Sequence, residues 1–264
     1  MFIGACIDTL YTELPWEKRF AAAKDDGFDC VEFWDWRNID LRATKRHADE
    51  AGIWISGFNG DADFSLIDPS QQAGYLDYLR QSLEAAKLLG APSVTIHSNA
   101  LGEGGVVVNR YGDVSDTVKL CAMYETLRRA AEIAEEYGIR LHLEALNVHT
   151  DHVGNFLKYT KTGAELVRMV GSPHLKLLYD VYHMQINEGR ICGTLSESID
   201  CIGHIHIADA PGRHEPGTGE INYVNVLGHL RRLGYQGAVG CELFPAEDTA
   251  TAVKAIMRVK QAAL

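Results

Sequence analysis

The chain has 264 residues, of which 46% are hydrophobic and 23% charged, so it can bury a substantial core and is neither disordered nor collagen-like. Its 25 Lys and Arg against 36 Asp and Glu give a formal net charge of −11 at pH 7. That charge argues against a nucleic-acid-binding protein, because binding a phosphate backbone requires clustered cations. No apolar run reaches the ~18 residues of a membrane span, and residues 1–17 lack the basic region of a signal peptide. We expect a cytoplasmic protein with no nucleic-acid or membrane partner.

Short β-branched and aromatic runs alternate with amphipathic stretches along the whole chain. Residues with capping preferences separate them: Asp40 and Ser115 are predicted N-caps, and Gly52 and Gly138 follow predicted helix ends. In chain order, strands are predicted at 2–8, 30–34, 53–59, 93–98, 140–145, 174–180, 202–208 and 237–243. Helices are predicted at 15–26, 40–51, 72–89, 115–137, 161–170, 194–200, 222–233 and 248–262.

Eight strand-then-helix units predict a single α/β domain, residues 1–264, folded as a (β/α)8 TIM barrel. A doubly wound sheet is the alternative, but the first predicted strand ends in Asp8-Thr9-Leu10-Tyr11 rather than in a glycine-rich phosphate loop. The longest non-periodic stretches, 99–114 and 146–160, directly follow strands. In a barrel, loops at these places lie over the active-site face.

Polar residues end the last four predicted strands, where an apolar residue would be expected. They are Glu144, Asp180, His206 and Glu242. One acid at a strand end is commonly a helix N-cap or an ion-pair partner, but capping hardly explains four strands in succession. If these residues converge at the rim of the barrel, a divalent cation is the simplest way to neutralise the crowded carboxylates. Three oxygen donors and one nitrogen favour Mg²⁺ or Mn²⁺, with Co²⁺ as a further candidate.

Further polar residues lie beside these strand ends. His97 ends another predicted strand and fits either a substrate contact or loop packing, whereas His183 follows Asp180 by three residues and is expected beside the metal. The loop 211–220 carries Arg213 among prolines and glycines that restrict its backbone. A planar guanidinium there can bind a substrate hydroxyl or carboxylate; an ordinary charged surface loop is the alternative.

Other polar residues are expected deeper in the barrel. Strand alternation places His142 and His204 on the same faces as the strand-end residues that follow them, and both are interpreted as core histidines with satisfied hydrogen bonds. Glu32 is interpreted as a polar residue of a lower layer. Trp34, near the same strand end, is a candidate wall of a sugar pocket.

The chain resembles the hydroxypyruvate isomerase family over essentially its whole length, most clearly in the segments TELPWEKRFAAAKDDGFDCVEFW, GSPHLKLLYDVYHMQINEG and GHIHIADAPGRHEPGTGEINY. That family belongs to the xylose-isomerase-like barrels, together with the ketose 3-epimerases. The resemblance implies that His183 and Arg213 bind substrate and that two glutamates move the proton, Glu144 and Glu242. It also implies one divalent metal ion, held by Glu144, Asp180, His206 and Glu242.

The resemblance leads to two competing functions. The favoured one is a metal-dependent isomerase acting on a small hydroxy-oxo acid, converting hydroxypyruvate to tartronate semialdehyde through an enediolate. The alternative is a 3-epimerase acting on a free ketose, which His206 favours because the resembled isomerases typically carry Gln there and the epimerases carry His. A nuclease with the same barrel and a non-catalytic sugar-binding protein remain as further alternatives. Barrels of this family often pair, so the expectation includes a homo-oligomer.

Overall fold

Eight parallel strands form one sheet in the computed structural model, which describes residues 1–263. The strands are hydrogen-bonded in the order β3-β2-β1-β8-β7-β6-β5-β4. Every predicted strand is confirmed, although each is shorter than predicted. They are β1 (Phe2–Cys6), β2 (Cys30–Glu32), β3 (Trp54–Gly57), β4 (Ser93–Ile96), β5 (Arg140–Glu144), β6 (Leu175–Asp180), β7 (Ile202–Ile207) and β8 (Ala238–Cys241).

The sheet closes between its two outer strands, β3 and β4. Asn59, just past β3, forms a parallel bridge with Thr95 on β4. The Thr95 amide donates to the carbonyl of Phe58 at 2.8 Å, and the Gly60 amide donates to the carbonyl of Thr95 at 2.7 Å. The predicted (β/α)8 barrel is therefore confirmed, and the carboxyl ends of its eight strands surround one opening.

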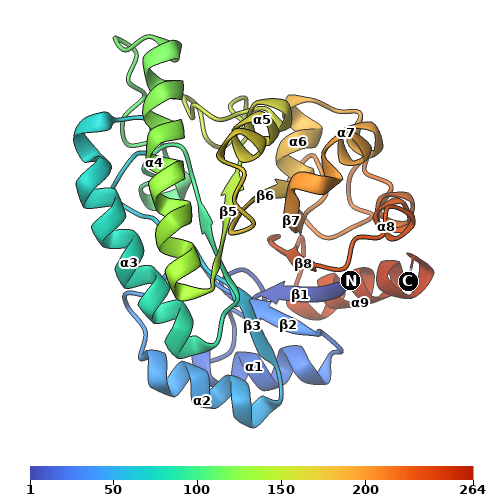
Figure 1. Ribbon diagram of the computed structural model, residues 1–264. Coiled ribbons are helices and arrows are strands. Elements are labelled where there is room, and N and C mark those ends of the chain that lie inside the picture. The colour runs from blue at the N-terminus through green and yellow to red at the C-terminus, as the bar shows by residue number, and fades with distance from the viewer. Residues whose placement is uncertain (264) are drawn as a thin grey trace.

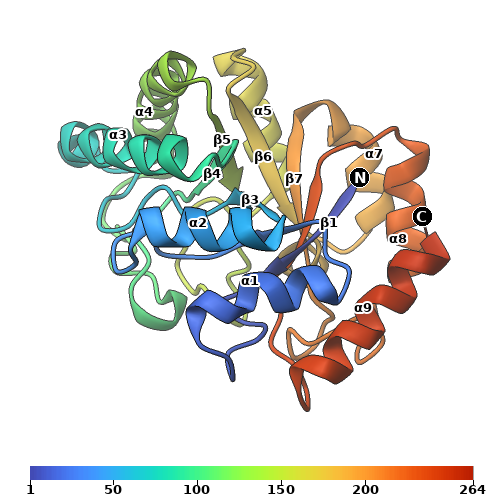
Figure 2. The same cartoon turned by 90° about the horizontal axis from the view of Figure 1, so that it is seen from below.

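Helices surround the barrel in chain order (Figure 1), and Figure 2 shows the same outer layer from below. The predicted N-caps are confirmed: the Asp40 side chain accepts from the Ala43 amide at 3.0 Å, and Ser115 accepts from the Val118 amide at 3.4 Å. The helices are α1 (Trp16–Asp25), α2 (Leu41–Ala51), α3 (Gln72–Leu89), α4 (Asp116–Tyr137), α5 (Thr160–Val170), α6 (Val181–Asn187), α7 (Ile191–Ser198), α8 (Tyr223–Arg232) and α9 (Thr249–Ala263).

Two helices differ from the prediction, both after β6. No helix is predicted at α6, because its seven residues are too few to show a helical period. The helix predicted at 194–200 is α7, which begins at Ile191 and ends at Ser198, and a 3-10 turn follows it at Ile199–Cys201. The chain after β6 therefore forms two short helices where one was expected.

Apolar side chains fill the space between the sheet and the helices, and Leu79, Leu83 and Leu127 are fully buried there. Polar side chains are also buried, among them Glu32 and His204, on strands that form the barrel wall. In the part of the chain that the structure describes, no helix is long and apolar enough to span a membrane.

The packing of α3 can be tested with one substitution at two positions, because Leu79 is 0% exposed and Leu88 is 39% exposed. Leu79→Ala is expected to lower the free energy of unfolding by about 2–5 kcal/mol, since it leaves a cavity in the core. Leu88→Ala should change it by only about 0.5 kcal/mol. Urea denaturation followed by circular dichroism measures both values, and equal losses would contradict this packing.

Candidate active site

The carboxyl ends of β5 to β8 bring the four strand-end residues together at the mouth of the barrel. Glu144 and Asp180 are the last residues of β5 and β6, His206 lies on β7, and Glu242 directly follows β8. Asp180 and His206 are register partners on adjacent strands. His206 Nδ1 lies 3.5 Å from Glu242 Oε2 and 4.0 Å from Glu144 Oε1. We refer to these four side chains as the mouth cluster.

Three atoms of the mouth cluster have no hydrogen-bond partner among the described residues. Glu144 Oε1, Asp180 Oδ2 and His206 Nδ1 are buried and make no hydrogen bond to any of residues 1–263. Candidate ligand atoms of Asp180, His206 and Glu242 lie within 4.8 Å of one another. Buried polar atoms without a partner are costly, and a divalent cation with oxygen and imidazole ligands would satisfy them. The residues present therefore fit the metal ion that the sequence predicts.

Burial and charge act differently on two of the carboxylates. Burial raises the pKa of Asp180 to about 7, with Arg213 opposing the rise and Glu144 adding to it. Burial also acts on Glu242, but the charges of Arg213 and His206 outweigh it and hold the pKa of Glu242 well below its usual range. Asp180 is thus the carboxylate whose ionised form the protein stabilises less, and a cation beside Oδ2 would stabilise it.

The two oxygens of Asp180 have different surroundings, so the capping role and the expected metal-ligand role do not exclude each other. Its Oδ1 caps α6 by accepting hydrogen bonds from the amides of Tyr182 at 2.7 Å and His183 at 3.2 Å. Its Oδ2 faces the mouth cluster and lies 3.6 Å from His183 Nε2. The cap therefore orients the carboxylate and leaves the second oxygen available for a cation.

The hydrogen bonds around His183 determine which ring nitrogen carries the proton. Asn147 Oδ1 accepts from the amides of Thr150 and Asp151, both at 3.1 Å, so Asn147 Nδ2 is the group that lies 2.7 Å from His183 Nδ1. Burial lowers the pKa of His183 well below its usual range, so the ring is neutral and Nδ1 accepts from Asn147. The proton is then on Nε2, which faces the mouth cluster and is suited to donating to a substrate oxygen.

A rigid loop after β7 holds Arg213 at the mouth. The fully buried Asp209 accepts three hydrogen bonds from loop amides, at distances between 2.8 and 3.0 Å. Arg213 has a φ of 59°, a left-handed conformation that costs a non-glycine residue about 1–2 kcal/mol. Its amide donates to the carbonyl of Asp209 at 3.0 Å, and its carbonyl accepts from the Phe244 amide at 2.9 Å. Strain held in this way is common where one side chain must be placed accurately.

The Arg213 guanidinium lies against the mouth cluster. It pairs with Glu242, lies 3.9 Å from Asp180 Oδ2 and packs over the Tyr182 ring, 5.4 Å from its centroid. Its Nε has no hydrogen-bond partner within residues 1–263, so one N–H remains for a substrate oxygen. Trp34 Nε1 donates to Glu242 Oε1 at 2.5 Å, which places an indole ring beside the same carboxylate.

His97 contacts the mouth cluster through Glu144. Its Nε2 lies 3.1 Å from Glu144 Oε2, and its Nδ1 lies 2.9 Å from Asp61 Oδ1. Although burial favours the neutral ring, Asp61 and Glu144 raise the pKa of His97 to about 10, so the imidazolium donates to both carboxylates. His97 therefore holds Glu144 from outside the cluster, and its contact with substrate stays a prediction.

Sequence reasoning missed three residues of this site, Asp61, Asn147 and Asp209. Each is polar and lies just after a predicted strand, so the same attention to strand ends that found the mouth cluster could have found them. His142 differs from the prediction in another way. It is expected to be a satisfied core histidine, but its Nε2 is buried without a hydrogen-bond partner among the described residues.

Comparison with known proteins agrees with the resemblance. The family model described as xylose isomerase-like TIM barrel matches residues 20–260. The 2-oxo-tetronate isomerase of Cupriavidus necator is 32% identical, and the hydroxypyruvate isomerase of Escherichia coli is 33% identical; each alignment covers 93% of this chain and 94% of the relative.

Solved structures share the same fold. A protein described as an AP endonuclease, family 2, from Brucella melitensis superposes with a TM-score of 0.87 at 26% identity, over 98% of this chain and 99% of that one. An L-ribulose 3-epimerase superposes with a TM-score of 0.83 at 22% identity, over 99% of this chain and 94% of that one. Together with the family match, these findings show that the chain belongs to the xylose isomerase-like TIM barrel family.

Proposed function

We propose that this protein is a divalent-metal-dependent isomerase that moves a proton between adjacent carbons of a small hydroxy-oxo acid. The observation that carries the proposal is the set of buried atoms at the barrel mouth, Glu144 Oε1, Asp180 Oδ2 and His206 Nδ1, which have no hydrogen-bond partner in residues 1–263. The names of two relatives, a hydroxypyruvate isomerase and a 2-oxo-tetronate isomerase, support a short 2-oxo acid with a neighbouring hydroxyl group. We take hydroxypyruvate as the substrate and tartronate semialdehyde as the product.

The mouth cluster would hold the cation. Its oxygen-rich donor set suits Mg²⁺ or Mn²⁺, with Co²⁺ as a further candidate. A bound divalent cation supplies electrostatic stabilisation of the negative charge that develops on substrate oxygens. His183 Nε2–H and Arg213 Nε–H would donate to substrate oxygens, which fixes the substrate relative to the glutamates.

Proton transfer would depend on Glu144 and Glu242. The carbonyl group of hydroxypyruvate acidifies the C–H bonds of its hydroxymethyl carbon, and one of the two glutamates removes a proton there. Return of a proton to the former carbonyl carbon, with the hydroxyl proton passing to the former carbonyl oxygen, gives tartronate semialdehyde. A carboxylate held within the site is suited to this exchange.

A ketose 3-epimerase is the second candidate, and His206 is the residue that favours it. The same groups would serve both reactions, because each begins with removal of a proton next to a carbonyl group. The reactions differ in where the proton returns: to the neighbouring carbon in isomerisation, and to the opposite face of the same carbon in epimerisation.

Activity should depend on both the cation and the glutamate pair. Protein supplied with Mg²⁺ or Mn²⁺ is expected to interconvert hydroxypyruvate and tartronate semialdehyde, and EDTA should abolish turnover until the cation is restored. Glu242→Gln should lower kcat by about 10²- to 10⁴-fold, because an amide cannot carry the proton. Glu247→Gln, at an exposed position nearby, is the matched control and should keep the wild-type kcat when turnover is followed by NMR.

Turnover that survives exhaustive chelation would contradict the metal requirement. A protein inactive on hydroxypyruvate that epimerises a free ketose would instead identify the second candidate.

Asp180→Asn should separate capping from cation binding. The asparagine keeps an oxygen for the cap of α6 but loses the negative charge, so we expect Tm close to wild type and weaker Mn²⁺ binding. The loss should exceed the ~10- to 100-fold that is typical of residues outside the ligand set. Asp248→Asn is the control, because Asp248 accepts from the Thr251 amide at 2.7 Å at the start of α9. Equal Mn²⁺ affinities by EPR titration would argue against Asp180 as a ligand.

Arg213→Lys should weaken substrate binding, since a hydrogen bond to a charged group contributes about 1.5–3 kcal/mol. We expect KM for hydroxypyruvate to rise by about 10- to 100-fold, the equivalent of that energy. Arg190→Lys is the control: Arg190 also has a positive φ, of 52°, but its side chain is 67% exposed and pairs with Glu197. An unchanged KM in Arg213→Lys would remove this residue from the substrate site.

A further inference from the structure

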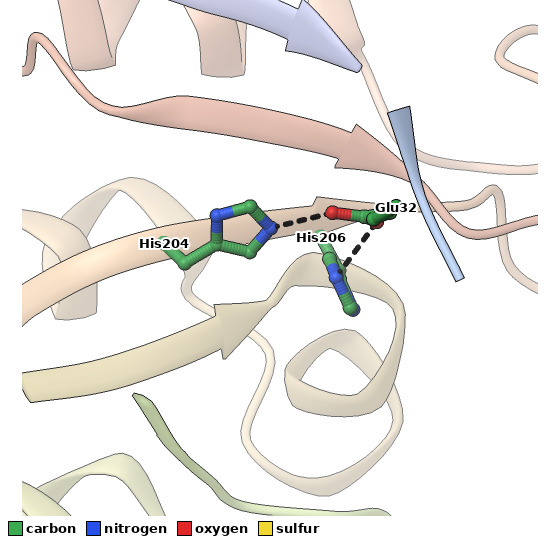
Figure 3. A group of neighbouring side chains, drawn as sticks. All are labelled: Glu32, His204 and His206. Atoms are coloured by element: carbon green, nitrogen blue, oxygen red, sulfur yellow. Dashed lines mark hydrogen bonds and ion pairs between the residues drawn. The ribbon is translucent and has the colours of Figure 1, made fainter. Parts of the chain in front are cut away.

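A second group of titratable side chains adjoins the mouth cluster. Glu32 on β2 and both His204 and His206 on β7 are buried, and the Glu32 carboxylate faces the two imidazole rings (Figure 3). His204 Nε2 lies 2.9 Å from Glu32 Oε2, and His206 Nε2 lies 3.0 Å from Glu32 Oε1. We propose that Glu32 is a positioning residue, which holds the His206 ring so that Nδ1 is presented to the cation. This inference rests on the metal centre of the proposed function.

The two nitrogens of His206 face different surroundings. Nδ1 faces Glu242 and Glu144 in the mouth cluster, whereas Nε2 faces Glu32. Glu32 Oε1 makes no hydrogen bond to the described residues and lies 3.0 Å from His206 Nε2, so it is available to accept the proton on that nitrogen. A proton held there leaves Nδ1 with a lone pair, which is the form of the ring that binds a cation.

Gly240 on β8 provides the room that the Glu32 carboxylate occupies. A Cβ atom at position 240 would lie 1.9 Å from Glu32 Oε1 and 2.5 Å from its carboxyl carbon. Gly240 is also the register partner of His206 on the adjacent strand. The absent side chain at 240 thus lets the Glu32 carboxylate lie against the His206 ring.

A second cation held by Glu32, His204 and His206 is the competing interpretation, since their ligand atoms lie within 4.8 Å of one another. That arrangement would require His206 to bind one cation through Nδ1 and another through Nε2, so the ring would have to lose both protons. The positioning role needs only the ordinary neutral imidazole, with its one proton directed to Glu32.

Mn²⁺ titration of the full-length protein, followed by EPR without substrate, tests the proposal. Glu32→Gln keeps the volume of the side chain but offers one acceptor oxygen to two ring N–H groups. We expect the Kd for Mn²⁺ to rise by about 10- to 100-fold, with one ion per chain in wild type and variant. His204→Asn is the matched control, because it removes the other imidazole contact of the same carboxylate, and it should cost less affinity than Glu32→Gln.

Gly240→Ala is a second variant that displaces the carboxylate while leaving Glu32 in place, and it should also raise Kd. Wild-type Kd values in both variants, even with a lower Tm, would overturn the proposal and leave Glu32 a purely structural residue. Two ions per wild-type chain, with one lost in Glu32→Gln, would overturn it in favour of the second cation. A wild-type protein that binds no Mn²⁺ would overturn the metal centre itself, a result distinct from the other two.

Discussion

The constraint on which this site depends is the burial of several carboxylates at the mouth of a closed parallel barrel. Because all the strands run in the same direction, the acids at the ends of β5, β6 and β8 meet in one place from which the described chain largely excludes water. Their repulsion is stronger there than at a surface. The protein responds by holding one atom of each group from outside: His97 contacts Glu144 Oε2, the start of α6 holds Asp180 Oδ1, and Glu32 faces His206 Nε2. The inward atoms of these groups remain for a cation.

The same arrangement gives two neighbouring histidines different chemistry. The partner of His183 is the side-chain amide of Asn147, which donates and so leaves the ring proton directed into the site. The partner of His206 is the carboxylate of Glu32, which can only accept and would, in the role proposed above, hold the ring proton on the side away from the site. Their roles therefore follow from the groups behind them. For His183 and His206 to exchange their proposed roles, Asn147 and Glu32 would have to change as well.

Fold alone does not select a reaction for this chain. Proteins described as an AP endonuclease and as a 3-epimerase superpose on it along almost its full length, which agrees with the general observation that one barrel supports many activities. Under the proposed function the selection would come from the mouth, where the loop held by Asp209 places the Arg213 guanidinium beside carboxylates and Trp34 lies against Glu242. The site is charged, which supports the short, oxygen-rich substrate proposed above.

The sequence by itself determined the eight strands and the caps at Asp40 and Ser115, because β-branched runs and capping preferences are local properties of the chain. It also indicated the mouth cluster, since helix capping hardly explains polar residues at the ends of four successive strands. It did not reveal α6, which is too short to show a period and whose N-cap is Asp180, the last residue of β6. Nor could it pair His97 with Asp61, Asn147 with His183 or Glu32 with His206, because each pair joins segments far apart in the chain. Only closure of the barrel brings those segments within hydrogen-bonding distance, so only the tertiary structure decided which nitrogen or oxygen of each side chain faces the site.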